Sequence, residues 1–262
     1  MNKVQKGDVS ALGKSFTVKT DRPIGTIHPK HPEIIYPVNY GFVPDLFAGD
    51  GEEQDVYILG VDEPVDEITV TIVAIVLRSD DDEDKWVGVP EELLGTPLCY
   101  ECNIRKAVNF QEQFHTSVID ALYEKTCGAV MFTEQDGVRK YLLITNNSGH
   151  IGFPKGHVEF GENEEQTAVR EVCEETGLHA ELIGGFRMEY RYTNGEGHHK
   201  NPVYFLSEYN ANVKLQTEEI TSSYLLPYEK ALSTLNYPQD KPILEAAEKF
   251  LNETKNKCIC CL

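Results

Sequence analysis

No apolar run in this sequence approaches the ~18 consecutive residues that a membrane-spanning helix needs. The N-terminal stretch from Met1 to Phe16 is polar and lacks the apolar core of a secretory signal, so we expect a cytoplasmic protein with no membrane partner. Apolar residues make up 40% of the 262 residues, which excludes a disordered or collagen-like chain and is enough to bury a core. The length corresponds to roughly 1.7 average domains.

Positive charge is also scarce, because 24 lysines and arginines stand against 43 acidic residues and give a net charge of −19. A surface this negative repels the phosphates of a duplex, so a general nucleic-acid binder is not expected. Phosphate-containing substrates remain possible, because bound divalent cations can invert the local charge. Most acidic runs are solvated faces. The clusters to test for metal-ligand spacing are Asp50–Asp55, Asp80–Asp84 and Glu159–Glu175.

The seven cysteines are an odd number in a chain without a visible export signal, which argues against a disulfide framework. Cys99 and Cys102 form a single C-x-x-C with no second pair at zinc spacing, so we expect two idle thiols. The chain ends in Cys258-Ile259-Cys260-Cys261-Leu262. Prenylation needs cysteine fourth from the end, where this chain has Ile259, so we expect a frayed, reducible terminus.

The pattern of apolar and turn-forming residues indicates a strand-rich first half and a mixed second half. Strands are predicted at 56–59, 68–76, 86–89, 182–192 and 203–206, with a hairpin of 127–132 and 141–145 around Asp136-Gly137. Helices are predicted at about 104–124, 164–176 and 241–253. We place the domain boundary within the first of these helical stretches, which gives domains 1–118 and 119–262.

The predicted helix at 164–176 has clear start and stop signals. Asn163 is a good N-cap with Gln166 three residues later, and Glu164 and Glu165 suit the positive end of the helix dipole. Gly177 is a natural residue for the left-handed turn that ends a helix. We therefore expect a helix from Glu164 to Thr176.

The same helix places three carboxylates together. At 100° per residue, one apolar face contains Ala168, Val169, Val172 and Cys173. Glu171, Glu174 and Glu175 lie within about 100° of one another, away from that face. Carboxylates at this spacing repel one another unless a cation lies between them, and Mg²⁺ or Mn²⁺ prefers such oxygen ligands. A solvated acidic face explains the spacing equally well.

The wider motif resembles the Nudix box, G-x5-E-x7-R-E-U-x-E-E-x-G-U, at every fixed position from Gly156 to Leu178. The resemblance implies the Nudix α/β/α sandwich and hydrolysis of a nucleoside diphosphate linked to another group. It implies that Glu171, Glu174 and Glu175 are metal ligands, together with the carbonyl of Gly156. By the same resemblance, Arg170 orients the glutamates and Glu162 supports the helix.

Residues around the box resemble the asymmetrical diadenosine tetraphosphate hydrolases, over about Thr126 to Leu251. The similar segments are Phe153-Pro154-Lys155-Gly156-His157-Val158-Glu159, Cys127-Gly128-Ala129 and Gly185-Phe186-Arg187-Met188-Glu189-Tyr190-Arg191-Tyr192. The resemblance implies that Tyr190 or Tyr192 stacks on adenine and that Lys155 and Lys200 bind substrate. It implies that Glu219, beside Glu218, is a base or a further metal ligand. Ile151 stands where that subfamily often has tryptophan.

The first domain resembles soluble inorganic pyrophosphatases over about Thr17 to His115. The similar segments are Tyr36-Pro37-Val38-Asn39-Tyr40-Gly41-Phe42, Asp50-Gly51-Glu52-Glu53-Gln54-Asp55-Val56 and Lys85-Trp86-Val87-Gly88-Val89-Pro90. The resemblance implies a small closed β-barrel in which Asp50, Asp55 and one of Asp80–Asp82 are metal ligands, supported by Tyr40.

Four positions depart from the pyrophosphatase pattern. Glu52 and Glu83 stand where that family has aspartate, and Phe114-His115 stands where it has Tyr-Lys. We therefore expect a barrel that binds metal and phosphate but hydrolyses pyrophosphate poorly.

Three functions fit these observations. The first is an Mg²⁺- or Mn²⁺-dependent hydrolase that cleaves diadenosine tetraphosphate to ATP and AMP. The second is a Nudix hydrolase of another nucleotide derivative, such as an RNA 5′ end or a nucleotide sugar. The third is a nucleotide- or phosphate-sensing module whose barrel binds without turnover.

Overall fold

The computed structural model describes residues 2–28, 31–159, 161–216 and 218–259. Two compact units are present: the first consists of Met1–Glu124 with Thr193–His199, and the second of Lys125–Tyr192 with Lys200–Leu262. The helices within the described ranges include none that is both long and apolar enough to cross a bilayer. The cysteine-rich end, Cys258–Leu262, lies outside the side chains that the structure describes, so its fraying stays a prediction.

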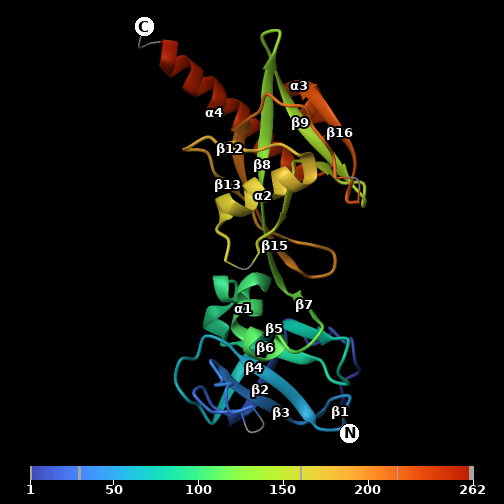
Figure 1. The fold of residues 1–262 in the computed structure, drawn as a ribbon, viewed down its shortest axis with the longest axis vertical. Helices are drawn as coiled ribbons and strands as arrows, with labels where there is room; N and C mark the ends of the chain where they lie inside the picture. Colours follow the sequence, from blue (N-terminus) through green and yellow to red (C-terminus); the bar gives the residue numbers. More distant parts are fainter. Residues whose placement is uncertain (1, 29–30, 160, 217, 260–262) are drawn as a thin grey trace. The chain divides into compact units, whose positions relative to one another are not determined.

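Five strands of the first unit close into a barrel (Figure 1). The ring runs β3–β2–β5–β6–β4 and closes because β4 pairs with β3 again. Its strands are β2 (Ser15–Arg22), β3 (Asn39–Phe47), β4 (Glu53–Ile58), β5 (Glu67–Arg78) and β6 (Lys85–Val89). The short β1 (Asn2–Lys3) pairs with β3, and β7 (Ser117–Ala121) pairs with β5. The predicted small closed β-barrel is confirmed.

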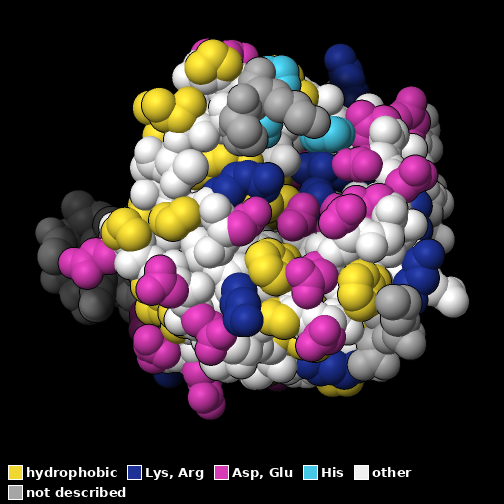
Figure 2. Space-filling model, turned by 90° about the horizontal axis from the view of Figure 1, so that it is seen from below, with side chains coloured by type: hydrophobic (Ala, Val, Ile, Leu, Met, Phe, Trp, Pro, Cys, Tyr) yellow, Lys and Arg dark blue, Asp and Glu magenta, His cyan; other side chains and the backbone are white. Residues whose placement is uncertain are grey.

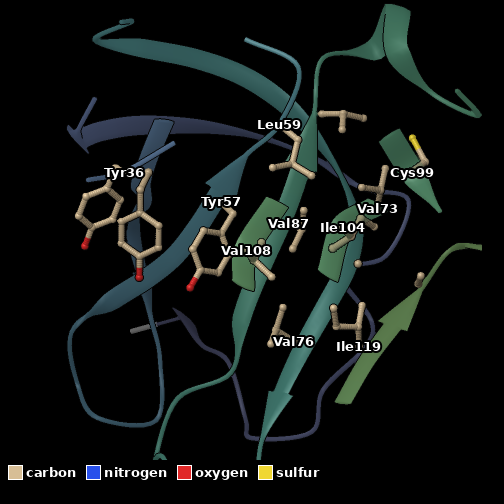
Figure 3. Close-up of a cluster of buried hydrophobic side chains, with 14 residues drawn as sticks. Tyr36, Tyr57, Leu59, Val73, Val76, Val87, Cys99, Ile104, Val108 and Ile119 are labelled. Atoms are coloured by element: carbon tan, nitrogen blue, oxygen red, sulfur yellow. The ribbon is translucent and has the colours of Figure 1, made fainter. Parts of the chain in front are cut away.

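Two buried clusters stabilise this unit. One draws side chains from all five barrel strands, including Val18, Val43 and Trp86. The other packs the helix α1 (Glu101–Glu112) against the sheet through Ile104 and Val108 (Figure 3). Each fully buried aliphatic side chain contributes about 1.5–3 kcal/mol relative to exposure. Two short 3₁₀ turns, Glu91–Leu93 and Pro97–Cys99, lead into α1.

The prediction of one long helix over about 104–124 is wrong, because α1 ends at Glu112. Residues 117–121 alternate instead: Val118 is 66% exposed, whereas Ile119 and Ala121 are buried. They form β7, which pairs with β5 in antiparallel register. This pairing supplies hydrogen-bond partners for backbone groups of β5 that would be unpaired if β5 were an edge strand there. The expected division after residue 118 therefore falls inside a strand, and the first compact unit extends to Glu124.

The second unit is a sheet with helices on both faces (Figure 1). Its central path runs β10–β9–β8–β15–β12; β11 pairs with β8, β13 and β14 pair with β15, and β16 pairs with β9. The strands are β8 (Tyr123–Gln135), β9 (Val138–Asn146), β10 (Ile151–Gly152), β11 (Lys155–His157), β12 (Glu181–Leu182), β13 (Met188–Glu189), β14 (Tyr192–Thr193), β15 (His199–Glu208) and β16 (Ile220–Pro227). The helices are α2 (Glu164–Thr176), α3 (Tyr228–Thr234) and α4 (Lys241–Ile259), with a 3₁₀ turn at Pro238–Asp240 before α4.

Alternation along β8 separates the two helical layers. Ala129 and Met131 pack with α2, in the same buried cluster as Val172. Val130 and Phe132 point the other way and share a cluster with residues of α3 and α4. The α/β/α sandwich predicted for the second domain is confirmed. The β8–β9 hairpin is confirmed as well, with Asp136 and Gly137 both at positive φ (53° and 73°).

Candidate active site

Helix α2 begins and ends at the residues that the sequence predicts. The Asn163 side chain accepts the N–H of Gln166, and the Gln166 side chain accepts the N–H of Asn163, both at 2.9 Å. Gly177 ends the helix in the left-handed region, at a φ of 68°. An N-cap of this kind stabilises a helix by about 1 kcal/mol. Because both ends are fixed, the position of each glutamate along the helix is fixed too.

The Arg170 guanidinium holds three glutamates beside α2. Its Nε and Nη2 donate to Glu162 at 2.7 and 3.0 Å. Its Nη1 donates to Glu171 at 2.7 Å and to Glu174 at 2.8 Å, and Nη2 also donates to the carbonyl oxygen of His157 at 2.8 Å. One side chain therefore links the two helix carboxylates to the segment that precedes the helix.

The backbone of β11 lies directly against these carboxylates. A Cβ at Gly156 would lie 2.1 Å from the carboxyl carbon of Glu171, so only glycine leaves this carboxylate in place. The N–H of Lys155 donates to Oε2 of Glu175 at 2.9 Å. Strand pairing with β8 fixes β11, with Gly156 opposite Cys127. Glu171 and Glu175 are thus both in contact with the same short strand.

The carboxylates of this cluster differ in how easily they ionise. Burial, followed by the charge of Glu171, raises the pKa of Glu175 to about 8. Burial also raises the pKa of Glu171, more than the hydrogen bond from Arg170 lowers it. Hydrogen bonds from Arg170 have the opposite effect on Glu162 and lower its pKa to about 2. Glu171 and Glu175 are therefore neighbouring acids, and additional positive charge beside them would stabilise their ionised forms.

This donor set fits a hard divalent cation, which prefers carboxylate and carbonyl oxygens and would relieve the repulsion between Glu171 and Glu175. Within the described ranges, no three acidic, histidine or cysteine side chains already converge on one point. Arg170 engages Glu171 and Glu174 instead. A cation bound here would compete with these two ion pairs.

Glu219 lies just before β16, where two hydrogen bonds hold its backbone. Its N–H donates to Oε1 of Gln216 at 2.8 Å, and its carbonyl accepts the N–H of Asn147 at 3.0 Å. The carboxylate charge of Glu219 is one of the causes that raise the pKa of Glu175. The structure therefore brings Glu219 within electrostatic reach of α2. Its neighbour Glu218 accepts the Asn147 side-chain amide through its carbonyl.

The candidate substrate-binding residues lie on two segments. Tyr190 and Tyr192 stack on each other, with ring centroids 5.7 Å apart and an interplanar angle of 25°. Both rings are half-buried, and the Tyr190 hydroxyl donates to Asp240 at 3.0 Å. Lys200 is the second residue of β15, and Lys155 begins β11 beside Glu175. The structure places Lys155 within the carboxylate cluster, whereas it holds Tyr190 through the buried Asp240.

One ionic cluster was not found by sequence reasoning. The Glu164 carboxylate accepts from Lys125 and from Arg187, the latter at 2.6 and 2.9 Å. Hydrogen bonds from Arg187 are the main cause that lowers the pKa of Glu164 to about 2. The sequence shows Glu164 only as a favourable first-turn acid, because its partners are distant in the chain. These contacts attach the segment that leads to Tyr190 to the start of α2.

In the first unit, Lys85 pairs with Asp55, a candidate metal ligand, and with Glu83. Its ammonium group donates to Asp55 at 2.6 Å and also to Glu83. Asp55 also accepts the Tyr40 hydroxyl at 2.6 Å. Asp50 instead accepts the N–H of Glu52, at 3.0 Å within its own turn. The structure thus brings Asp55, Glu83 and Tyr40 together around a lysine and keeps Asp50 on the exposed loop.

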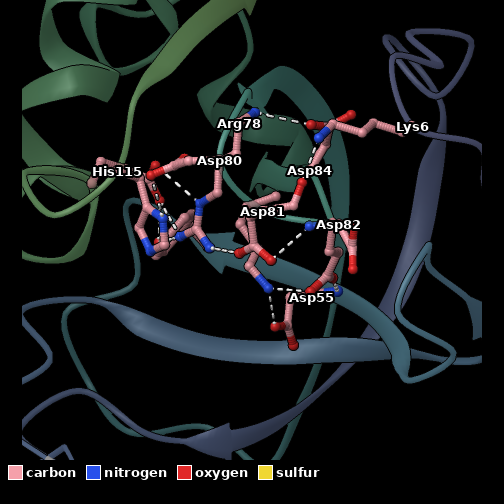
Figure 4. Close-up of polar contacts among 12 residues, drawn as sticks. Lys6, Asp55, Arg78, Asp80, Asp81, Asp82, Asp84 and His115 are labelled. Carbon is pink, nitrogen blue, oxygen red and sulfur yellow. Dashed lines mark hydrogen bonds and ion pairs between the residues drawn. The ribbon is translucent and has the colours of Figure 1, made fainter.

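Two acids of the loop that contains Asp80–Asp84 also have basic partners (Figure 4). Arg78 donates to Asp81 at 2.8 Å and, on its other side, to the buried Glu112 at 2.5 Å. His115 forms an ion pair with Asp80 at 3.5 Å, if it is protonated. Figure 2 shows one face on which basic side chains lie between acidic ones. Asp55, Asp81 and Glu83 therefore already have cationic partners from the chain itself.

Comparison with known proteins identifies the second unit. A family model described as the NUDIX domain matches residues 122–247. The asymmetrical bis(5′-nucleosyl)-tetraphosphatase of Mus musculus is 32% identical over 144 residues, which span 50% of this chain and 97% of that protein. The chain belongs to the Nudix family. Its second unit is therefore a Nudix hydrolase domain, and Nudix hydrolases generally use a divalent metal.

Two further proteins are each similar to about half of this chain. The NAD-capped RNA hydrolase NudC of Actinobacillus succinogenes is 30% identical over 149 residues, which span 52% of this chain and 51% of that protein. A crystal structure of an Ap4A hydrolase of C. elegans in a binary complex is 26% identical. It covers 50% of this chain and 98% of that one, with a TM-score of 0.47.

Proposed function

We propose that the Nudix domain hydrolyses dinucleoside polyphosphates such as diadenosine tetraphosphate, giving ATP and AMP, with Mg²⁺ or Mn²⁺ as its metal. The observation that carries this proposal is the carboxylate cluster of α2, in which Glu171 and Glu175 lie side by side against β11. The tetraphosphatase relative, which aligns over 97% of its own length, supports the choice of substrate.

In this proposal, Glu171, Glu174 and Glu175 hold the metal together with the carbonyl of Gly156. A divalent cation there offsets the charge that develops on the polyphosphate oxygens. Arg170 keeps Glu171 and Glu174 in position through its two contacts with them. The raised pKa values of Glu171 and Glu175 fit this role. Burial makes both carboxylates harder to ionise, and a cation bound beside them would stabilise their ionised forms.

The reaction is hydrolysis of one phosphoanhydride bond, in which water attacks a phosphorus of the polyphosphate and a nucleotide leaves. Glu219 is our candidate base, because its carboxylate charge reaches the α2 cluster. It takes one proton as the water oxygen bonds to phosphorus, and the bond from that phosphorus to the leaving phosphate oxygen breaks. Lys155 and Lys200 bind the polyphosphate, and Tyr190 or Tyr192 stacks on a base. Catalysis by this route depends mainly on positioning and charge stabilisation.

The main alternative is hydrolysis at an RNA 5′ end, which the 30% identity to an NAD-capped RNA hydrolase favours. A nucleotide sugar is a further substrate of the same class. A nucleotide-sensing module without turnover fits the Nudix domain less well, because all three α2 glutamates and Arg170 are present. A cytoplasmic location stays a prediction.

A substrate panel distinguishes these alternatives. The full chain, with Mg²⁺, is incubated with diadenosine tetraphosphate, triphosphorylated RNA, NAD-capped RNA and ADP-ribose, and consumption is followed by chromatography. We expect the highest kcat/KM for the dinucleotide. Faster consumption of either RNA would reject the proposed substrate in favour of the RNA-end alternative. Binding without consumption of any compound would favour the sensor.

For the first unit, we propose a pyrophosphatase-like barrel of residues 1–118 that binds phosphate and metal but turns pyrophosphate over slowly. Asp50 and Asp55 are the proposed metal ligands. The position of Lys85 between Asp55 and Glu83 supports low activity, because a cation would have to compete with an ammonium group already paired to both acids. Displacing a catalytic carboxylate by about 1 Å can itself cost ~10²-fold in rate, and Glu83 is one methylene longer than aspartate.

The full chain carrying Glu174→Gln, which removes the proposed Nudix activity, should release phosphate from pyrophosphate only slowly in Mg²⁺. A phosphate-release assay beside a working inorganic pyrophosphatase measures this rate. Brisk, Mg²⁺-dependent release that disappears on adding Asp55→Asn would contradict the expectation and make the protein a two-activity enzyme.

A further inference from the structure

The turn between β14 and β15, Thr193–His199, belongs to the first compact unit, although both strands pair within the sheet of the second. The chain therefore leaves the second unit after Tyr192 and re-enters it at Lys200. Both of these residues are candidates for substrate binding, so the position of the turn bears directly on the proposed site. No motif in the sequence marks the residues between them.

The turn is closed by its own hydrogen bonds. The N–H of Asn194 donates to the carbonyl oxygen of His198 at 2.9 Å, and the N–H of Gly197 donates to the carbonyl oxygen of Asn194 at 3.1 Å. The Asn194 side chain accepts the N–H of His198 at 2.9 Å, and the Thr193 hydroxyl is bonded to Nδ1 of His199 at 2.9 Å. Asparagine side chains stabilise turns in this way. Because these bonds close the turn, its residues move together.

Three contacts attach the turn to other parts of the first unit. Nε2 of His198 is bonded to Oδ1 of Asp120 at 3.0 Å, and the histidine is the donor because an ionised carboxylate only accepts. The N–H of His199 donates to the carbonyl oxygen of Leu122 at 2.8 Å. The His199 ring lies 4.8 Å from the ring of Tyr123. The side chains of Asp120 and His198 are only 29% and 15% exposed, so their bond is partly shielded from water.

The residues that anchor the turn are held by the barrel. Asp120 lies on β7, which pairs with β5. The N–H of Leu122 donates to the carbonyl oxygen of Val73 in β5 at 2.8 Å. Tyr123 packs against the buried cluster that joins α1 to the sheet. The turn is therefore attached to the sheet and the core of the first unit.

We propose that the first unit positions Lys200 for substrate binding, with Asp120 and Tyr123 as the positioning residues. They act through the turn, which His198 and His199 attach to them. His199 directly precedes Lys200, and their Cα atoms are about 3.8 Å apart across a trans peptide. A restrained backbone lowers the entropy cost of ordering the lysine on a polyphosphate. The inference rests on the proposed function, because that proposal assigns Lys200 to the polyphosphate.

Cutting the anchor should weaken substrate binding without slowing the chemical step. Asp120→Ala removes the acceptor of His198, and the loss of one net hydrogen bond predicts a roughly 3- to 10-fold higher KM for diadenosine tetraphosphate, with kcat within about 2-fold of the wild type. Steady-state kinetics of the full chain in Mg²⁺ measure both values. Asp62→Ala is the matched control, because it removes an exposed carboxylate from the loop between β4 and β5 of the same unit, and it should change neither value.

A double-mutant cycle tests whether Asp120 acts through Lys200. Lys200→Ala alone should raise KM, and adding Asp120→Ala should then raise it by less than about 2-fold, because the group that is positioned has gone. Independent effects that multiply would overturn the inference. A purely structural role would lower the unfolding temperature of Asp120→Ala and leave KM unchanged, which would overturn it too. If Asp120→Ala does not fold, Tyr123→Leu takes its place in the cycle, because it removes the ring contact with His199.

Failure of the proposed function gives a different result from failure of this inference. If the wild type consumes another compound of the substrate panel instead, the same cycle is measured with that compound. If it consumes none, the Kd of ADP in Mg²⁺, measured by calorimetry, replaces KM. A Kd that rises in Asp120→Ala but not in Asp62→Ala would support the positioning role although the proposed reaction fails. An unchanged Kd, or no binding of ADP by the wild type, would reject the positioning role.

Discussion

Replacing Glu174 with glutamine is expected to lower kcat for diadenosine tetraphosphate by ~10²-fold or more, since it removes a proposed metal ligand's charge. Glutamine keeps the size of the side chain and can still accept from Arg170, which donates to Glu174 at 2.8 Å. The Glu174 side chain is 57% exposed, so little stability should be lost. Steady-state kinetics and nucleotide binding measure the two effects, and binding should survive.

Glu165→Gln is the matched control for this substitution. Glu165 lies on the same helix, is exposed and belongs to its first turn, away from the β11 contact. It removes the same charge from the same helix, so it should leave kcat within about 2-fold of the wild type. If Glu174→Gln behaves like Glu165→Gln, the assignment of the metal site to this face of α2 is wrong.

A single methyl group at Gly156 is expected to abolish most activity while leaving the fold intact. The added Cβ would lie 2.1–2.2 Å from the carbon and both oxygens of the Glu171 carboxyl group. This group is the end of a flexible side chain, so it should move aside rather than unfold the domain. Movement of a proposed metal ligand by about 1 Å can cost ~10²-fold in rate. Kinetics and thermal unfolding of Gly156→Ala measure both effects.

Gly184→Ala is the corresponding control, because a Cβ there meets no atom within 4 Å. It should leave both kcat and the unfolding temperature close to the wild-type values. A Gly156→Ala protein with full activity would show that Glu171 does not need its present position. A Gly156→Ala protein that unfolds would show that the glycine serves packing instead.

The centre of the candidate site could be predicted from the sequence because it depends on one helix. Asn163 and Gly177 mark its ends locally, and its period then decides that Glu171, Glu174 and Glu175 share a side. The contacts that complete the site depend on tertiary structure. Glu219, the proposed base, comes from a segment more than 40 residues away from α2. Asp240 reaches Tyr190 only after the sheet and α4 have packed.

The wrong helix prediction in the first unit has a similar cause. Residues 113–121 continue a polar, amphipathic pattern, and pairing with the neighbouring edge of β5 makes residues 117–121 a strand. The resemblance implies that Asp50, Asp55 and one of Asp80–Asp82 are metal ligands, and the sequence shows Lys85 only as a neighbour of the acidic loop. In the folded protein its ammonium group pairs with Asp55 and Glu83. Local sequence patterns thus predict helices and strands better than they predict which charged side chains form ion pairs in the folded protein.

The products formed from diadenosine tetraphosphate test the central claim most directly. The full chain is stripped of metal with EDTA, Mg²⁺ is restored, and the nucleotides are separated by ion-exchange chromatography. We predict no reaction before Mg²⁺ is added and equal amounts of ATP and AMP afterwards. Two molecules of ADP per substrate, or no consumption of the dinucleotide at all, would contradict the proposal that this Nudix domain is an asymmetrically cleaving dinucleoside polyphosphate hydrolase.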